Sequence, residues 1–427
     1  MKYIGNRIGH SVERARAGTD NTGIFNIAQQ HKLSYQNEWN NDFSPFNTSA
    51  PTNRHKTASH PANNQRYHLF ISGTNIFFIG GTQGVYMNYT VVGGGGGGGN
   101  APQESYPKGG GGGGGGGGFV DGQVWFPPGT YTARVGDGGA GAPSTKGAVA
   151  SNGTPSYISG PSNFTTITAT GGGAGASYYG DPENTTLGRN AGDGGSGGGA
   201  CGSPSEASNE GSGNTPPTSP VQGFDGGGRP FGTGPYTVGG AGGGGAGSVG
   251  YPSYNGTLYY GEDDAGGRGG DGRAYGVVKE DIHANFPVRV GVHHEPSPTL
   301  FINGAEKRFC GGGGGGGADR MITYPNKGVA FDGGGDGGSS YIANGDPTNG
   351  TPGTANTGGG GGGAGTYAAP PFPANVMNTG GQGGSGVILV LKTNTQILIK
   401  RILSPFVNIS LIQLPNDLVL HWSWSLH

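Results

Sequence analysis

Four uninterrupted runs of glycine constrain what this chain can fold into more than any other feature: 93–99, 109–118, 311–317 and 358–363. Fixing one backbone residue costs about 1–2 kcal/mol, and glycine lies at the high end, so ordering residues 109–118 costs on the order of 10–20 kcal/mol. No side chain is present to offset this cost. An ordered run therefore needs backbone hydrogen bonds to neighbouring chains on several sides.

The left-handed threefold helix is the backbone geometry that suits such an array. It has three residues per turn, a rise of about 3.1 Å and no internal hydrogen bonds, so every N–H and C=O group points outward. Neighbouring glycine helices can pair these groups laterally, whereas a β-carbon at the contact would hold the chains apart. Disordered tethers of the Gly/Ser kind are the alternative. The purity and recurrence of the runs favour a packed bundle.

Short β-strand patterns lie between the glycine runs. The stretch "RYHLFISGTNIFFIGGTQGVYMNYTVV" alternates and is rich in Ile, Phe, Tyr and Val, which predicts two or three strands that lead directly into the first run. The stretch "QVWFPPGTYTARVGDGG" predicts a further strand pair turned at Pro127, Pro128 and Gly129. The expected fold class is mainly β with little α-helix, combining short β-strands and hairpins with a packed bundle of left-handed polyglycine-II helices.

A weak internal repeat supports this architecture. A strand that ends in Arg-Val-Gly, a short hairpin around Ser-Gly or Asn-Gly, and a strand that runs into glycine occur in that order within 129–176 and again within 285–317.

The distribution of glycine divides the chain into three parts. Glycine makes up 101 of 427 residues, against an average share of about 7%, but residues 1–64 contain only four glycines and residues 387–427 none. We expect an N-terminal attachment segment (1–64), a glycine-rich domain with inserted loops (65–392) and an apolar C-terminal tail (393–427). Two interpretations of the tail stay open: strands that oligomerise the chain, or frame-shifted sequence.

Charge and cysteine content exclude several classes of protein. The formal net charge is −2 and the Lys and Arg residues are scattered, so nucleic-acid binding is not predicted. Cys201 and Cys310 allow one optional disulfide. The first twenty residues lack the apolar core of a signal peptide, which indicates synthesis in a cytoplasm. Charged residues and prolines interrupt the tail, so no membrane span is predicted.

No catalytic or cofactor motif is predicted. Gly-x-Gly-x-x-Gly matches trivially inside polyglycine and lacks a strand–turn–helix context. His293 and His294 lie next to Glu295, but adjacent strand residues face opposite sides, so a surface hairpin is favoured over a metal site. Aspartates recur in glycine contexts at Asp137, Asp193, Asp271 and Asp336, where turns bonded to local N–H groups are favoured over an irregular calcium-binding repeat. We expect neither an enzyme nor a bound cofactor.

The order of the motifs resembles a known family. "YTVVGGGGGGG", "PPGTYTARVGDGGAGA", "TPSYISG", "ITATGGGAGA" and the closing "GGQGGSGVILVLK" are similar to the glycine-rich domain of bacteriophage tail fibres over roughly residues 70 to 392. The resemblance implies a virion protein with a polyglycine-helix sandwich, in which the loops between helices recognise the host surface. A structural glycine-rich protein of a cell wall or extracellular matrix, and an ice-binding polyproline-II bundle, are the alternatives.

The N-terminal stretch "RAGTDNTGIFNIAQQHKLSYQNEW" resembles a short pattern near the start of many marine phage virion proteins. Gly23, Ile24, Phe25 and Trp39 carry this resemblance, which implies attachment to other virion or tail proteins. An ordinary strand followed by an amphipathic turn is the alternative interpretation.

Tyrosines in the segments that join the glycine runs are the candidate receptor-contact residues, because rigid aromatic rings stack on sugars or pack on protein loops at low entropic cost. They are Tyr178, Tyr179, Tyr251, Tyr254, Tyr259, Tyr260, Tyr341 and Tyr367. The alternative is that some pack over the bundle as lids. The expected partners are a host surface protein or glycan, other virion proteins and further copies of the chain, with a trimer as the expected oligomer.

Overall fold

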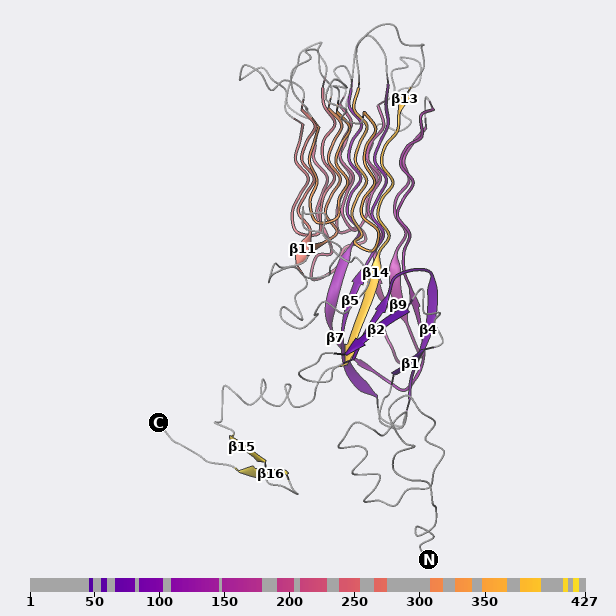
Figure 1. The fold of residues 1–427 in the computed structure, drawn as a ribbon, viewed down its shortest axis with the longest axis vertical. Coiled ribbons are helices and arrows are strands. Elements are labelled where there is room, and N and C mark those ends of the chain that lie inside the picture. Colours follow the sequence, from indigo (N-terminus) through magenta and orange to yellow (C-terminus); the bar gives the residue numbers. More distant parts are fainter. Residues whose placement is uncertain are drawn as a thin grey trace, which may run out of the picture.

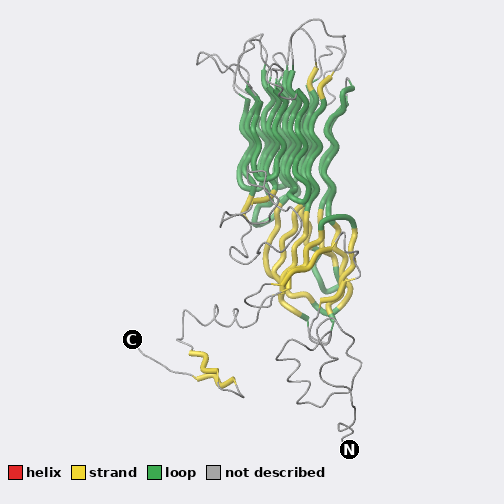
Figure 2. Tube along the Cα trace, viewed as in Figure 1, coloured by secondary structure: helices red, strands yellow, loops and turns green. Residues whose placement is uncertain are grey.

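The computed structural model describes a chain built from strands and extended segments. The described residues are 46–48, 55–59, 66–80, 84–102, 109–145, 148–178, 190–202, 208–228, 238–253, 265–274, 308–317, 327–339, 348–366, 377–392, 410–413 and 418–421. They contain no α-helix, which confirms the expectation of a mainly β chain. A β-sandwich lies at one end, and a long bundle of extended segments continues from it (Figures 1 and 2).

Two antiparallel sheets form the sandwich. In the first, the strand order is β2 (His55–Ser59), β3 (Arg66–Phe70), β14 (Val387–Lys392), β5 (Val85–Val92) and β7 (Phe119–Phe126). In the second, the order is β1 (Phe46–Thr48), β4 (Thr74–Ile79), β8 (Gly129–Arg134), β9 (Ser156–Ser159) and β10 (Ile167–Ala169). Short pairs of β6 (Ala101–Pro102) with β13 (Met377–Asn378), of β11 (Arg273–Ala274) with β12 (Arg308–Phe309), and of β15 (Ser410–Gln413) with β16 (Leu418–His421) complete the strands.

Aromatic side chains fill the space between the two sheets. Exposed and buried residues alternate along β4, which directs Phe77 into the core. The ring of Phe77 stacks on Tyr131 with 5.0 Å between centroids and on Phe70 with 5.8 Å. The hydroxyl of Tyr131 donates a 2.7 Å hydrogen bond to the carbonyl of Pro127, so the one polar atom of this buried ring is satisfied.

The strands occur where the sequence predicts them, but one pairing is wrong. The stretch 66–92 forms β3, β4 and β5, and β5 leads directly into Gly93. The strands on either side of Pro127, Pro128 and Gly129 do not form a hairpin, because β7 pairs with β5 and β8 pairs with β4 in the other sheet. The turn instead carries the chain across the core, where the rings of Phe126 and Tyr131 lie 5.2 Å apart.

The first copy of the predicted repeat is present. Strands β8, β9 and β10 pair in sequence, and β10 runs into the glycine segment that begins at Gly171. Most of the second copy, like His293, His294 and Glu295, lies outside the described residues.

Strands and glycine segments alternate along the chain. Residues 93–100, 135–142 and 170–178 follow β5, β8 and β10 and lead away from the sandwich, while 109–118 and 379–386 return to β7 and β14 (Figure 2). Each pairs laterally with several others through backbone hydrogen bonds.

The run 109–118 lies at the centre of the bundle and donates hydrogen bonds in three directions. The N–H groups of Gly112, Gly115 and Gly118 donate to segment 170–178 over 2.7–2.8 Å. The residues between them donate to 238–244 and to 358–364 in the same way, so each direction recurs at every third residue. The directions of these hydrogen bonds therefore have a period of three residues along the run.

Three further segments donate to the carbonyls of this run. They are 93–99, 196–202 and 313–316. The six surrounding segments also bond to one another in a closed ring, as when Gly172 donates to Gly94 and Gly173 donates to Ser196. The longest glycine run is thus enclosed on every side by backbone.

This enclosure explains why the run is pure. A β-carbon added at any residue of 109–117 would lie 1.8–2.3 Å from a backbone oxygen of a neighbouring segment. Real β-carbons do not approach other atoms so closely, so no residue except glycine fits.

Candidate functional site

Several glycine segments end together at the end of the bundle opposite the sandwich, which we call the tip. Gly93 and Gly118 adjoin the strands of the sandwich, so Asn100 and Gly109 mark the far end of the same two segments. At that level Tyr178 donates to Asn100 over 3.1 Å, Gly202 donates to Gly110 and Gly110 donates to Val238. Figure 1 places β13 at the same end.

The stretches that join these segment ends in the sequence, which we call the tip connections, lie outside the described residues. They are 103–108, 179–189, 203–207, 229–237, 254–264, 318–326, 340–347 and 367–376. The fold therefore brings segments far apart in sequence to one end of the bundle.

Tyrosine is concentrated in these connections. Nine of the 19 tyrosines of the chain fall within them: Tyr106, Tyr179, Tyr236, Tyr254, Tyr259, Tyr260, Tyr324, Tyr341 and Tyr367. Sequence reasoning selected six of these and missed Tyr106, Tyr236 and Tyr324. Each of the three lies in a stretch poor in glycine between glycine-rich segments, a signal that could have identified them.

Tyr178 is a packing residue. Its side chain is only 5% exposed and lies against Ala176 and Cys201. A β-carbon added at Gly109 would lie 2.7 Å from its ring. This burial agrees with the alternative interpretation of the tyrosines as lids, and it argues against direct contact between Tyr178 and a receptor.

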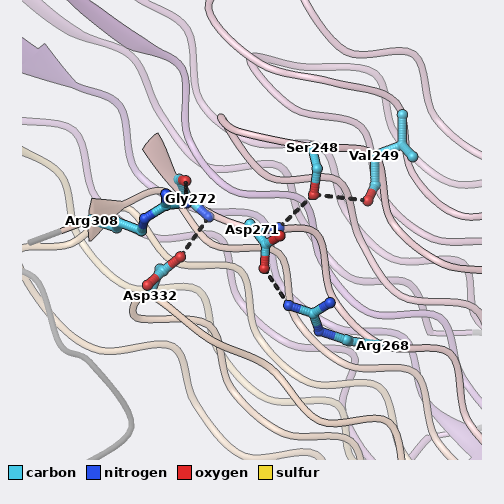
Figure 3. A network of polar contacts seen from close by, with 7 residues as sticks. All are labelled: Ser248, Val249, Arg268, Asp271, Gly272, Arg308 and Asp332. Carbon is cyan, nitrogen blue, oxygen red and sulfur yellow. Dashed lines mark hydrogen bonds and ion pairs between the residues drawn. The ribbon is translucent and has the colours of Figure 1, made fainter. Parts of the chain in front are cut away.

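Tyr251 is exposed, but on the side of the bundle instead of the tip. Its side chain is 43% exposed, and its N–H donates to Arg268 over 3.0 Å in the next segment. The guanidinium of Arg268 lies 5.3 Å from the Tyr251 ring centroid and 4.5 Å from that of Phe331. An ion pair with Asp271 holds this guanidinium, and Ser248 accepts from the N–H of Asp271 over 2.8 Å (Figure 3).

The predicted attachment residues Gly23, Ile24, Phe25 and Trp39 lie outside the described residues. Two short strands of the same N-terminal segment are described. Strand β1 pairs with β4 and β2 pairs with β3, so each sheet gains an edge strand from residues 46–59.

The expectation of local aspartate bonds agrees with Asp336, whose carboxylate accepts from the N–H of Ala330, six residues away. It is wrong for Asp193, which accepts a 2.6 Å hydrogen bond from the N–H of Ser212, nineteen residues away. Asp332 accepts from Gly272, sixty residues away, over 2.9 Å (Figure 3). These carboxylates occupy lateral positions in the bundle and satisfy backbone donors there. Within the described residues, no group of three or more His, Cys, Asp or Glu side chains could hold a metal ion.

The two cysteines are buried and free, so the optional disulfide is not formed. Cys201 precedes Gly202, which bonds to Gly110, whereas the carbonyl of Cys310 lies beside Gly116. Six extended residues with a rise of about 3.1 Å each separate these levels by roughly 19 Å, far beyond the reach of a disulfide. Complete burial raises the pKa of the Cys310 thiol above its ordinary value.

Comparison of the sequence with models of protein families gives a match that agrees with the fold. The model of the family described as "Glycine-rich domain" matches residues 71–391, most of the chain, so the protein belongs to this family. The matched range begins directly after β3 and ends within β14, and therefore spans both the bundle and most of the sandwich. A search of curated proteins finds no match. No helix among the described residues is long and apolar enough to span a membrane.

Proposed function

We propose that this chain is a non-enzymatic structural protein of a bacteriophage virion, a component of a tail fibre or similar appendage that binds the host cell surface. The observation that carries the proposal is that the described residues flanking the tyrosine-rich connections meet at one end of the bundle, opposite the sandwich. Loops that a rigid scaffold displays together form the arrangement that a recognition tip needs.

The scaffold in this proposal is an array of left-handed polyglycine-II helices. The threefold period of the hydrogen bonds supports it. Glycine can form a threefold helix of either hand, depending on the sign of φ. The described glycines with positive φ are Gly73, Gly129, Gly333 and Gly358, and of these only Gly358 belongs to a glycine run. The other described glycines of the runs therefore have negative φ. A threefold helix with negative φ is left-handed.

The sandwich end is the proposed attachment side. The N-terminal strands β1 and β2 join the sandwich, and the tail follows β14 out of it. We propose that residues preceding β1, including Gly23, Ile24, Phe25 and Trp39, bind other virion proteins. Further copies of the chain, in a trimer, complete the proposed assembly, and the tip faces the host.

Binding to cells tests the tip directly. The variant carries Tyr179, Tyr254, Tyr259 and Tyr260 changed to Ala, and the matched control is Tyr251→Ala, which removes an exposed ring from the side of the bundle. Fluorescently labelled proteins are added to a panel of bacterial isolates, one of which binds the unchanged protein, and melting curves are recorded in parallel.

The tip variant is expected to lose most cell binding while its stability stays within about 2 kcal/mol of the unchanged protein, because its substitutions lie in the connections. The control should bind as the unchanged protein does. Full binding by the tip variant would exclude these tyrosines from the contact surface. Equal losses in both variants would place the contact on the side of the bundle.

A further inference from the structure

Four adjacent segments form one side of the bundle, which we call the side wall: 135–142, 148–155, 348–355 and 379–386. Their neighbours are fixed by backbone bonds, since Ser151 donates to Ala140, Gly383 donates to Gly139 and Gly353 donates to Gln382, each over 2.8–2.9 Å. The wall is therefore a continuation of the same lattice that encloses the central run.

Exposed side chains recur along this wall at intervals of three residues. They are Asp137 and Ala140 on the first segment, Val149, Asn152 and Pro155 on the second, where Ser151 is exposed as well, and Asn349, Pro352 and Ala355 on the third. On the fourth, Gln382 is exposed between the half-buried Thr379 and Ser385. Because the helix has three residues per turn, each such set forms a single row facing outward.

If an outward row consisted of glycine, the backbone of another chain could pack against it and form hydrogen bonds with it. Inside the bundle, neighbouring segments bond through rows of bare glycine, and nothing but backbone is needed for the contact. The outer rows of this lattice are thus equivalent to the exposed edge of a β-sheet, which pairs with other chains unless it is blocked. If the outward rows of the wall were glycine, the same rows of a second copy would offer the matching backbone.

We propose that the side wall is a latent interaction surface for a second copy of this chain, and that its outward side chains keep it closed. An outward β-carbon would keep another backbone away, just as a β-carbon added to the central run would lie only 1.8–2.3 Å from a neighbouring backbone oxygen. Proline prevents pairing in a second way, because Pro155 and Pro352 have no N–H group to donate to another chain. Their fixed φ is compatible with the threefold backbone conformation, so they do not disturb the wall itself. Some outward side chains also occupy donors within the wall, as Asn349 does by accepting from the N–H of Thr379 over 2.8 Å.

The test replaces the outward side chains of two neighbouring segments with glycine. The open variant carries Asp137→Gly, Ala140→Gly and Gln382→Gly, which leaves residues 136–141 and 380–384 as glycine. The matched control carries Asp137→Ser, Ala140→Ser and Gln382→Ser, so it loses the same charge but keeps a β-carbon at each position. A second variant, Asp137→Gly with Ala140→Gly, opens one row and perturbs the fold less.

Sedimentation velocity measures the mass of each purified protein, and electron microscopy shows how the particles associate. We expect the control to keep the mass of the unchanged protein and the open variant to at least double it through side-by-side contact. A folded open variant with the mass of the control would overturn the proposal. Failure of both glycine variants to fold would also overturn it, because the side chains would then be needed for folding instead of for blocking association.

Discussion

At the scale of single residues, the β-carbon decides what the interior of the bundle accepts. A β-carbon at Gly113 would lie 2.1 Å from the carbonyl oxygen of Gly313, and one at Gly314 would lie 2.0 Å from that of Gly328. In both cases the obstacle is backbone, which is itself held by neighbours and cannot rotate away. The glycine requirement is therefore steric at nearly every position of the runs.

Gly113→Ala and Gly314→Ala are each expected to destabilise the folded protein by about 3 kcal/mol or more, since the added methyl group overpacks a rigid lattice. Gly80→Ala is the control, because no atom lies within 4 Å of the added carbon, and its effect should stay within about 0.5 kcal/mol. Chemical denaturation followed by circular dichroism measures the differences. Equal stability of all three variants would show that the runs are not packed.

The purity of the runs made the lattice predictable from sequence, whereas the surroundings of individual tyrosines were not. Tyr178 and Tyr179 are adjacent and identical in type, yet the backbone bond from Tyr178 to Asn100 keeps its ring within the bundle. No sequence pattern predicts at which residue a segment leaves the bundle. The lateral aspartate bonds were unpredictable for the same reason, because Asp332 and Gly272 meet only through the packing of their segments.

At the scale of elements, a few long polar side chains replace backbone partners where segments end. Gln222 is fully buried, and its Oε1 accepts from the N–H of Thr170 over 2.9 Å while its Nε2 donates to the carbonyl of Pro216 over 3.0 Å. Its own carbonyl accepts from Phe119, where the central run passes into β7. One glutamine thus joins the end of the central run to two other segments.

Replacement of Gln222 by Met keeps the size of the side chain and removes both hydrogen bonds. We expect a loss of about 1–3 kcal/mol, the cost of leaving a buried donor and acceptor unpaired. Gln382→Met, at an exposed position, is the matched control and should change stability by less than about 0.5 kcal/mol. Thermal and urea denaturation compare the two, and similar small effects would mean that Gln222 does not anchor the run.

Glycine segments carry no side chains that could specify their partners, so the order of neighbours was not predictable. The strands were easier to place, because β4 and β5 are rich in the aromatic and β-branched residues that favour strands. Their assignment to two sheets depends on how the chain crosses the core at Pro127, a feature that local patterns do not encode. Element positions followed from the sequence, whereas pairing required the whole molecule.

At the scale of the whole molecule, the architecture separates three tasks. The sandwich supplies an apolar core, the bundle is held by backbone hydrogen bonds, and the residues that flank the tip connections meet at the far end. A scaffold that does not depend on its loops for stability can change its binding specificity without refolding. This separation is what the proposed role in host recognition requires.

Hydrogen exchange of the central run, followed by mass spectrometry, tests the packed lattice most directly. Every N–H from Gly110 to Gly118 donates to a backbone carbonyl of another segment, so these amides should exchange only through global unfolding, as slowly as those of β5 and β14. Peptides that cover 109–118 are therefore expected to stay protected for as long as the sandwich core does. Complete exchange of this run within seconds, while β5 and β14 stay protected, would contradict the account.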